Sequence, residues 1–123
     1  MVQGDIVKIP YQKPAFENGQ VVGSIPVLDV QYGNVWTNID SKTFQQLQVR
    51  QGDVVLVTIF HDKKLVYKGE MPFVNTFAEV SEGSVLGYMN SLLNFSMGVN
   101  RNNFAEKFKV NSGPGWTVLL RKR

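Results

Sequence analysis

Hydrophobic positions along this chain come in short runs rich in Val, Ile, Leu and Phe, and turn-forming Gly, Asn, Asp and Pro separate these runs. Short apolar runs with such boundaries predict β-strands. The clearest run covers residues 54–60, where six of seven residues are β-branched or aromatic. The pattern of residues 20–30 predicts either one strand with a bend at Gly23 and Pro26 or two short strands. We also expect strands at residues 35–39, 65–67, 73–80, 85–89, 95–99 and 116–120.

Two short segments have a helical pattern instead. Asp40 or Ser41 can cap a helix through residue 47, and Asn102 or Asn103 can cap another through residue 108. Many short strands with one or two brief helices predict an all-β domain. We expect a closed Greek-key β-barrel, with a sandwich as the alternative.

The length of 123 residues fits a single folded domain. Residues 1–18 are loosely patterned, and Pro10 and Pro14 favour an extended conformation there. We therefore interpret residues 1–18 as an extended lead-in or the remnant of a linker, and residues 19–123 as one β-barrel domain.

Composition and charge exclude several protein classes. With 43% hydrophobic and 19% charged residues, the chain is globular rather than disordered, and it has no cysteine for disulfides or thiolate metal sites. No apolar run approaches the roughly 20 residues of a membrane span. The first residues lack the pattern of a signal peptide, so we expect a cytoplasmic protein with no membrane partner. The net charge of +3 is too small to indicate a nucleic-acid partner.

Residues suited to catalysis or metal binding are sparse. The single histidine, His61, lies in a polar turn, where an exposed turn residue is a better interpretation than a general base or a metal ligand. No His and carboxylate cluster has metal-ligand spacing, and no glycine-rich loop has phosphate-binding spacing. We therefore expect no metal, no cofactor and no self-sufficient catalytic apparatus.

The most informative segment, residues 32–39, places two aromatic rings and two side-chain amides within eight residues of apolar, strand-forming sequence. The amides of Asn34 and Asn38 can donate to and accept from the edge of a flat heterocycle such as adenine. The rings of Tyr32 and Trp36 can stack on its face. The alternative is structural, with Trp36 filling the core and Asn34 in a turn.

Two later segments could contribute to the same site. Phe77, within residues 75–79, is either a core residue or a stacking face. Residues 90–91 and 98–103 contain four Asn and one Arg around an expected helix start. These residues can cap the helix and offer backbone N–H groups to an acceptor, although capping alone requires no ligand.

The order of these segments resembles the carboxy-terminal domain of the S-adenosyl-L-methionine (SAM) hydroxide adenosyltransferase family. This family includes adenosine-forming SAM hydrolases and SAM-dependent chlorinases and fluorinases. Its first block, an aspartate followed by aromatic-Gly-Asn-x-x-Thr-Asn-Ile, is matched by Asp29 and residues 32–39. Three further blocks match a Thr-aromatic-Ala-acidic sequence at residues 76–79, a hairpin with Gly83 and residues 90–91, and an Asn-rich helix start at residues 99–105.

This resemblance implies a Greek-key β-barrel that binds the adenosyl part of SAM. Asn34 would contact the adenine edge, and Trp36 and Phe77 would flank the base. Ser91 would reach the methionine carboxylate. The remaining binding residues would be Asn100 and Arg101, mainly through backbone groups, and Tyr32, Asn38 and Val99.

The resemblance also implies a division of labour between domains. SAM would be the substrate of the parent enzyme, which would convert SAM and water to adenosine and methionine. The catalytic residues would lie in an amino-terminal domain that contacts this one in the same chain and from a neighbouring subunit of a homotrimer. Leu92 stands where halogenating members carry Arg, which removes a bidentate carboxylate partner. This difference favours water over halide, or else weaker binding of the methionine part. The isolated domain would bind weakly and be inactive.

Two other functions remain open. The chain could be a structural or oligomerisation β-domain with no ligand of its own. It could also be a basic OB-like nucleic-acid module, which needs Lys and Arg interleaved with aromatic residues on one face. The aromatic segments here are almost free of basic residues, so the nucleic-acid alternative is the weaker one.

Overall fold

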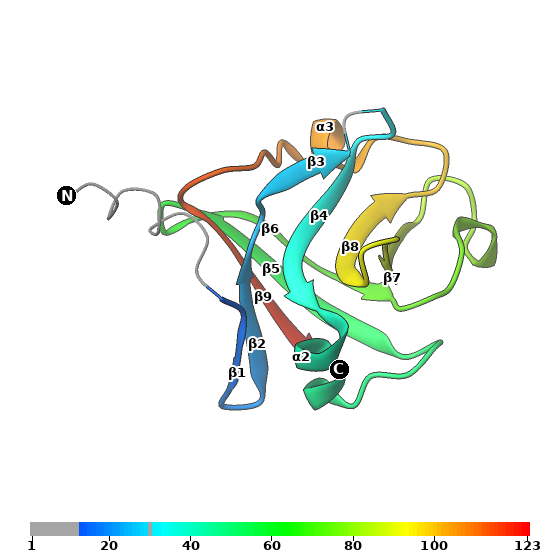
Figure 1. Ribbon diagram of the computed structural model, residues 1–123. Coiled ribbons are helices and arrows are strands. Elements are labelled where there is room, and N and C mark those ends of the chain that lie inside the picture. The colour runs from blue at the N-terminus through cyan, green and yellow to red at the C-terminus, as the bar shows by residue number, and fades with distance from the viewer. Residues whose placement is uncertain (1–12, 30) are drawn as a thin grey trace.

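The structure is a computed structural model, and it describes residues 13–29 and 31–123 (Figure 1). The strands are β1 (Ala15–Glu17), β2 (Gln20–Ser24), β3 (Val27–Asp29), β4 (Asn34–Asp40), β5 (Val54–His61), β6 (Lys64–Pro72), β7 (Val85–Met89), β8 (Asn94–Val99) and β9 (Trp116–Lys122). The helical elements are α2 (Ser41–Phe44), α3 (Phe104–Phe108) and the short 3-10 helices η1 (Gln45–Leu47) and η2 (Phe77–Glu79).

The strands form two antiparallel sheets. A five-stranded sheet has the order β1-β2-β9-β5-β6, and a four-stranded sheet has the order β3-β4-β8-β7. The segment at residues 20–30 is therefore two short strands, because β2 belongs to the first sheet and β3 to the second. In Figure 1, β4 and β8 lie in front of the long strands β5 and β9.

The predicted all-β class with short helices is confirmed. Strand pairing within the described ranges gives two separate sheets rather than one closed ring, so barrel closure stays a prediction. The boundary expected at residue 18 also stays a prediction. Residues 1–12 lie outside the described part, while Ala15–Glu17 pairs with β2 and so belongs to the five-stranded sheet.

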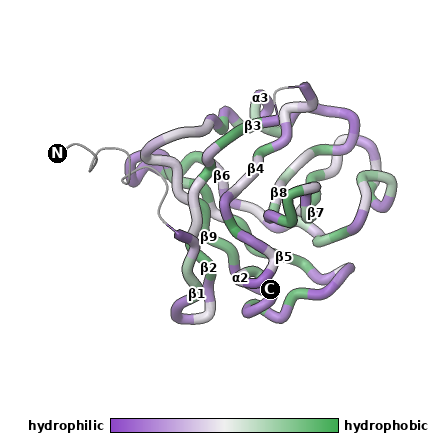
Figure 2. Tube along the Cα trace, in the orientation of Figure 1, coloured by the Kyte–Doolittle hydropathy of each residue, from purple (hydrophilic) through white to green (hydrophobic). Residues whose placement is uncertain are grey.

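The core lies between the sheets and follows from strand alternation. In β5, Val55, Val57 and Ile59 are buried, while the residues between them are partly exposed. Because successive side chains in a strand point to opposite faces, this period of two gives the sheet one core face. Figure 2 shows hydrophobic colour along the strands and hydrophilic colour at connections such as the β1–β2 turn.

Both helices begin at predicted caps. The carboxylate of Asp40 accepts hydrogen bonds from the Thr43 hydroxyl at 2.6 Å and the Thr43 N–H at 3.4 Å. These contacts hold the pKa of Asp40 below its usual value, and the Thr43 hydroxyl is the largest cause. Asn103 caps α3 in the same manner, because its Oδ1 accepts from the N–H of Glu106 at 2.8 Å.

Residues 73–80 differ from the extended strand that the sequence predicts. The Oε2 atom of Glu79 accepts hydrogen bonds from the N–H groups of Asn75 and Thr76, each at 2.9 Å. These bonds fold the segment into a loop with η2, which carries Phe77. A side chain can offer backbone donors an alternative to strand pairing in this way.

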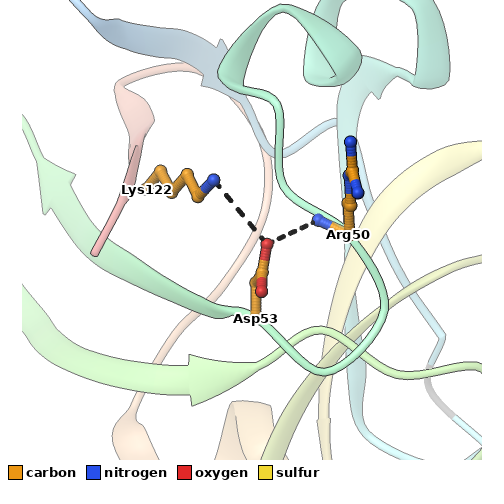
Figure 3. A network of polar contacts seen from close by, with 3 residues as sticks. All are labelled: Arg50, Asp53 and Lys122. Carbon is orange, nitrogen blue, oxygen red and sulfur yellow. Dashed lines mark hydrogen bonds and ion pairs between the residues drawn. The ribbon is translucent and has the colours of Figure 1, made fainter.

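A polar network ties the end of the chain to the start of β5 (Figure 3). Asp53 accepts a hydrogen bond from the Arg50 N–H at 2.9 Å and lies 3.8 Å from the Lys122 ammonium. The Asp53 carbonyl also accepts from the Phe73 N–H at 2.8 Å. Asp53 therefore connects the turn before β5, the end of β6 and the last strand.

The described segments contain no helix with the length and hydropathy needed to cross a membrane.

Candidate functional site

An open pocket of about 660 Å³ lies where β4 begins and β8 ends. Three segments that are far apart in the sequence meet there, namely the loop before β4, the η2 loop and the connection from β8 to α3. The lining residues are Gln31, Tyr32, Asn34, Phe77, Val99, Arg101, Asn102 and Asn103. The structure thus brings together Asn34, Phe77, Arg101, Tyr32 and Val99 from the predicted site.

Gly98 lies against two residues of the pocket lining, Asn34 and Phe77. A Cβ atom at this position would lie 2.7 Å from Oδ1 of Asn34 and 2.8 Å from Cζ of Phe77. Both distances are shorter than van der Waals contact, so a side chain on Gly98 would displace one of these groups. The missing side chain in β8 therefore allows the amide of Asn34 and the ring of Phe77 to approach the same point.

Asn34 is the polar group at the centre of this site. Its side chain is 5% exposed, and its Nδ2 donates to Oδ2 of Asp29 at 3.5 Å. Its Oδ1 is buried and has no hydrogen-bond partner among residues 13–29 and 31–123. A buried acceptor left unpaired costs about 1–3 kcal/mol, so Oδ1 is a position where a ligand donor would be stabilising.

Phe77 forms the aromatic wall of the pocket. Its ring is partly exposed and contacts the ring of Tyr88, with centroids 5.3 Å apart and planes tilted by 59°. The hydrogen bonds of Glu79 hold the loop that carries it. One face of Phe77 is thus fixed against the protein, and its position in the pocket wall leaves aromatic surface available for stacking.

Behind this wall, Trp36, Ser96 and Tyr88 form a row across β4, β8 and β7. Burial is the main cause that raises the pKa of Tyr88, whose hydroxyl lies among Trp36, Asp29, Ser96 and Asn34. Tyr88 therefore stays protonated near neutral pH. The Nε1 atom of Trp36 is buried and lacks a partner with hydrogen-bond geometry in the described part of the chain.

Gly33 joins the segment at residues 32–39 to the Asn-rich segment. Its carbonyl accepts a hydrogen bond from the Ala105 N–H at 2.9 Å, and a Cβ atom on it would overlap the side chain of Asn103. Gly33 has a φ of +73°, a conformation that glycine adopts without strain. These contacts therefore hold together the loop before β4, strand β4 and helix α3 around the pocket.

Asn100 and Arg101 differ in how their side chains lie relative to the pocket. The Nδ2 of Asn100 donates to the Val80 carbonyl at 2.9 Å, so its side chain holds the loop after η2. Arg101 is exposed, has a left-handed backbone with φ of 58°, and lines the pocket. Asn100 can still contact a ligand through its backbone, as the resemblance implies, and this contact stays a prediction.

Three other predicted residues lie away from the pocket lining. Trp36 pairs with Ser96 in β8, and Asn38 accepts a hydrogen bond from the Ser24 N–H at 2.8 Å, which links the two sheets. Ser91 is exposed in the β7–β8 turn, at the other end of β8, a strand about 17 Å long at the usual rise per residue. Asn90 organises that turn, because its Oδ1 accepts from the N–H groups of Leu92 and Asn94.

The residues that sequence reasoning missed as site residues are Gln31, Asn102, Asn103 and Tyr88. Asn102 and Asn103 had a visible signal, since both stand in the Asn-rich helix start, but they were interpreted as caps. Tyr88 carries no local signal, because only the pairing of β7 with β8 brings its ring to Phe77.

The pocket lining combines aromatic, amide and aliphatic side chains with one guanidinium group. The described residues hold no group of three His, Cys, Asp or Glu side chains that could bind a metal ion. His61 stacks on Trp116 with centroids 4.4 Å apart and lies 3.4 Å from the carboxylate of Asp62, which agrees with a turn residue. The pocket offers an aromatic face, an amide and backbone groups, which suit a flat neutral ligand.

Comparison with known families decides the classification. The family model described as "SAM hydroxide adenosyltransferase C-terminal domain" matches residues 23–117, which include every pocket residue. The chain belongs to the SAM hydroxide adenosyltransferase family, as its carboxy-terminal domain. The predicted family is therefore confirmed.

Relatives of this adenosyltransferase domain are longer than the chain. A fluorinase of Nocardia brasiliensis is 27% identical over 115 residues, which are 92% of this chain and 37% of that protein. A solved structure of an uncharacterized conserved protein from Thermotoga maritima has a TM-score of 0.78 and 27% identity, and it matches 90% of this chain and 39% of that one. A conserved hypothetical protein from Thermus thermophilus, with a TM-score of 0.52, 22% identity and coverage of 89% and 37%, shares the fold. The chain thus spans less than two fifths of the length of these relatives.

Proposed function

We propose that this domain binds the adenosyl part of SAM, or adenosine itself, in the pocket at Asn34. One observation carries the proposal: Asn34, whose buried Oδ1 has no hydrogen-bond partner in the described chain, lines the same pocket as Phe77. Adenine presents a flat aromatic face together with an amino donor at its edge. The base stacks on Phe77 while its amino group donates to Oδ1 of Asn34.

Other pocket residues contribute to the same contact. Tyr32 is 62% exposed and lines the pocket, so its ring is available to stack on the base. Val99 provides an apolar contact, and Asn100 and Arg101 offer backbone groups to the purine. Trp36, which pairs with Ser96 in β8, flanks the base, and Ser91 reaches the methionine carboxylate of SAM.

The parent enzyme converts SAM and water to adenosine and methionine. Leu92 stands where halogenating members carry Arg, and this difference supports water over halide. Most of the length of the relatives lies outside this chain, so we place the catalytic residues in an amino-terminal domain of a cytoplasmic parent. The amino-terminal domain contacts the carboxy-terminal domain in two ways, within the same chain and from a neighbouring subunit of a homotrimer. SAM is the substrate, no cofactor is needed, and the isolated domain does not turn it over.

Titration calorimetry of the chain with adenosine and with SAM tests the binding proposal. We expect saturable heat with adenosine, and a large loss of affinity in Asn34→Leu and Phe77→Ala. Gln46→Ala, at an exposed position in η1, is the control and retains binding. No heat at millimolar adenosine, with the fold intact by circular dichroism, would overturn the proposal.

One observation favours a second function. Leu92 and Leu93 are 67% and 61% exposed at the tip of the β7–β8 turn, which suits a contact with another domain or subunit. If adenosine does not bind, a structural or oligomerisation domain is the better description. A nucleic-acid module remains the weakest alternative, because Arg101 is the one cationic side chain among the pocket lining residues of the described chain.

A further inference from the structure

Two residues, Asn18 and Gly19, connect β1 to β2 at an exposed tip of the five-stranded sheet. We propose that Asn18 is a self-modification site: the backbone nitrogen of Gly19 attacks the Asn18 side chain, and conversion to isoaspartate detaches β1 from the sheet. The hairpin shares no residue with the lining of the pocket at Asn34, so this inference is independent of adenosine binding.

The turn between β1 and β2 favours these two residues for a structural reason. Glu17 pairs with Gln20, which leaves a loop of two residues. Asn18 has a φ of 52° and Gly19 a φ of 77°, and positive values at both positions are typical of a type I′ turn, for which Asn-Gly is a preferred pair. The sequence contains no second Asn-Gly pair. The hairpin therefore places this pair where solvent reaches it.

The surroundings of Asn18 leave its side chain free to react. Asn18 is exposed, and its side chain makes no hydrogen bond to another residue within 13–29 and 31–123. A Cβ atom on Gly19 would meet no atom within 4 Å, so open space surrounds the turn. Asn90, by contrast, is 6% exposed, and its amide makes three hydrogen bonds. Of these two asparagines, Asn18 is the one that can turn its side chain onto the nitrogen of the next residue.

The reaction at Asn18 consumes water and needs no other reagent. The Gly19 amide loses its proton to a base in the solvent, and its nitrogen, which no Cβ atom shields, bonds to Cγ of Asn18. The side-chain nitrogen of Asn18 leaves as ammonia. Water then opens the five-membered succinimide ring, at the main-chain carbonyl to give isoaspartate or at Cγ to give aspartate. Either product carries a new carboxylate, which lowers the formal net charge of +3 by one unit.

Isoaspartate at position 18 is incompatible with the hairpin. It carries the main chain through the side-chain carbon and so adds one backbone atom to the loop. Because loop length and turn type fix the register of a hairpin, the pairing of Glu17 with Gln20 is lost. Strand β1 has three residues, all exposed, and pairs with β2 alone in the described sheet. Its release leaves β2 as an unpaired edge strand.

Peptide mapping of the chain after ageing in mildly alkaline buffer tests the chemistry. Mass spectrometry with fragmentation locates each asparagine that has exchanged its amide for a carboxylate, and labelling by an isoaspartyl methyltransferase identifies the isoaspartyl form. We expect Asn18 to react first, Asn111 more slowly because serine follows it at an exposed position, and Asn90 last. An unmodified Asn18, or modification of Asn111 at the same rate or faster, would overturn the assignment of the site.

Hydrogen exchange of the same aged samples tests the release of β1. The amides of Gln20 and Val22, which lie opposite Glu17 and Ala15, should lose protection with age, while the amides of β5 keep theirs. Asn18→Gly is the matched control, because Gly-Gly also forms this turn and has no amide to react, so its protection should stay constant. If wild type that carries isoaspartate keeps the protection of this variant, the release of β1 is wrong. Should Asn18→Gly not fold, fresh wild-type chain provides the same comparison.

Discussion

Gly98 and Phe77 approach so closely that a Cβ atom on the glycine would lie 2.8 Å from Cζ of the ring. The same atom would lie 2.7 Å from Oδ1 of Asn34. One missing side chain in β8 thus makes room for both the aromatic wall and the amide of the pocket. The pocket therefore requires a residue without a side chain at position 98, and the hydrophobic pattern of the strand does not reveal this requirement.

Gly98→Ala should therefore weaken adenosine binding at least tenfold, because the added methyl group displaces Asn34 or Phe77. Overpacking of this kind also costs about 1–3 kcal/mol in the free energy of unfolding. Gly87→Ala is the matched control, since its Cβ would lie 2.7 Å from the ring of Phe95 in the core. Urea denaturation should show a similar loss of stability in both variants, and calorimetry a loss of binding in Gly98→Ala alone. Equal binding losses would contradict this assignment.

Gly33→Ala tests the junction between the loop before β4 and α3. The variant combines a left-handed backbone with overlap of the Asn103 side chain. Gly19→Ala has a similar positive φ, with no atom within 4 Å of the added Cβ, so it measures backbone strain without crowding. We expect Gly19→Ala to cost about 1 kcal/mol in the free energy of unfolding and Gly33→Ala clearly more. Equal values in urea denaturation would show that Asn103 does not pack against Gly33.

Asp40 makes stability depend on pH. Its pKa is lowered in the folded state, chiefly by the Thr43 hydroxyl, so the ionised form is stabilised by folding. This contribution is present above the unfolded pKa of about 3.8 and is lost as pH falls through the lower folded value. Asp40→Ala should cost roughly 1 kcal/mol at pH 7 through loss of the cap, and less at pH 2.

Asp40→Asn separates charge from capping in the same experiment. Its amide oxygen can still accept from the Thr43 N–H, so the helix cap remains. The difference in unfolding free energy between wild type and Asp40→Asn should shrink as pH falls from 7 to 2. A difference that grows at acid pH would contradict the lowered pKa.

Glu79→Ala should affect binding more than stability. The change removes the acceptor for the N–H groups of Asn75 and Thr76, so the loop that carries Phe77 loses its two side-chain anchors. Because these hydrogen bonds are exposed, we expect less than about 1 kcal/mol of lost stability, but a several-fold weaker affinity for adenosine. Glu82→Ala, at an exposed position in the next turn, is the control and should leave both quantities unchanged.

Local patterns predicted the fold class and most elements, while the site needed tertiary contacts. The β-branched run at residues 54–60 and the caps at Asp40 and Asn103 act within a few residues, so the sequence alone reveals them. The segment around Phe77 was expected to be extended, but Glu79 folds it through hydrogen bonds that strand propensity does not include. Ser91 was expected to contact the same ligand as Asn34, and the direction of β8 places the two residues near opposite ends of that strand.

The most direct test of adenosine binding follows the pocket groups themselves by NMR. The ¹⁵N-labelled chain is titrated with adenosine while the chemical shifts of four amide groups are followed: the side-chain amide of Asn34 and the backbone amides of Gly98, Val99 and Arg101. These four chemical shifts should change together and saturate at the same adenosine concentration. The side-chain amide of Gln46, an exposed group in η1, should remain unshifted. Saturating shifts confined to these pocket groups are the result that we predict. An unchanged Asn34 amide at millimolar adenosine, in a spectrum of the folded protein, would contradict the central claim.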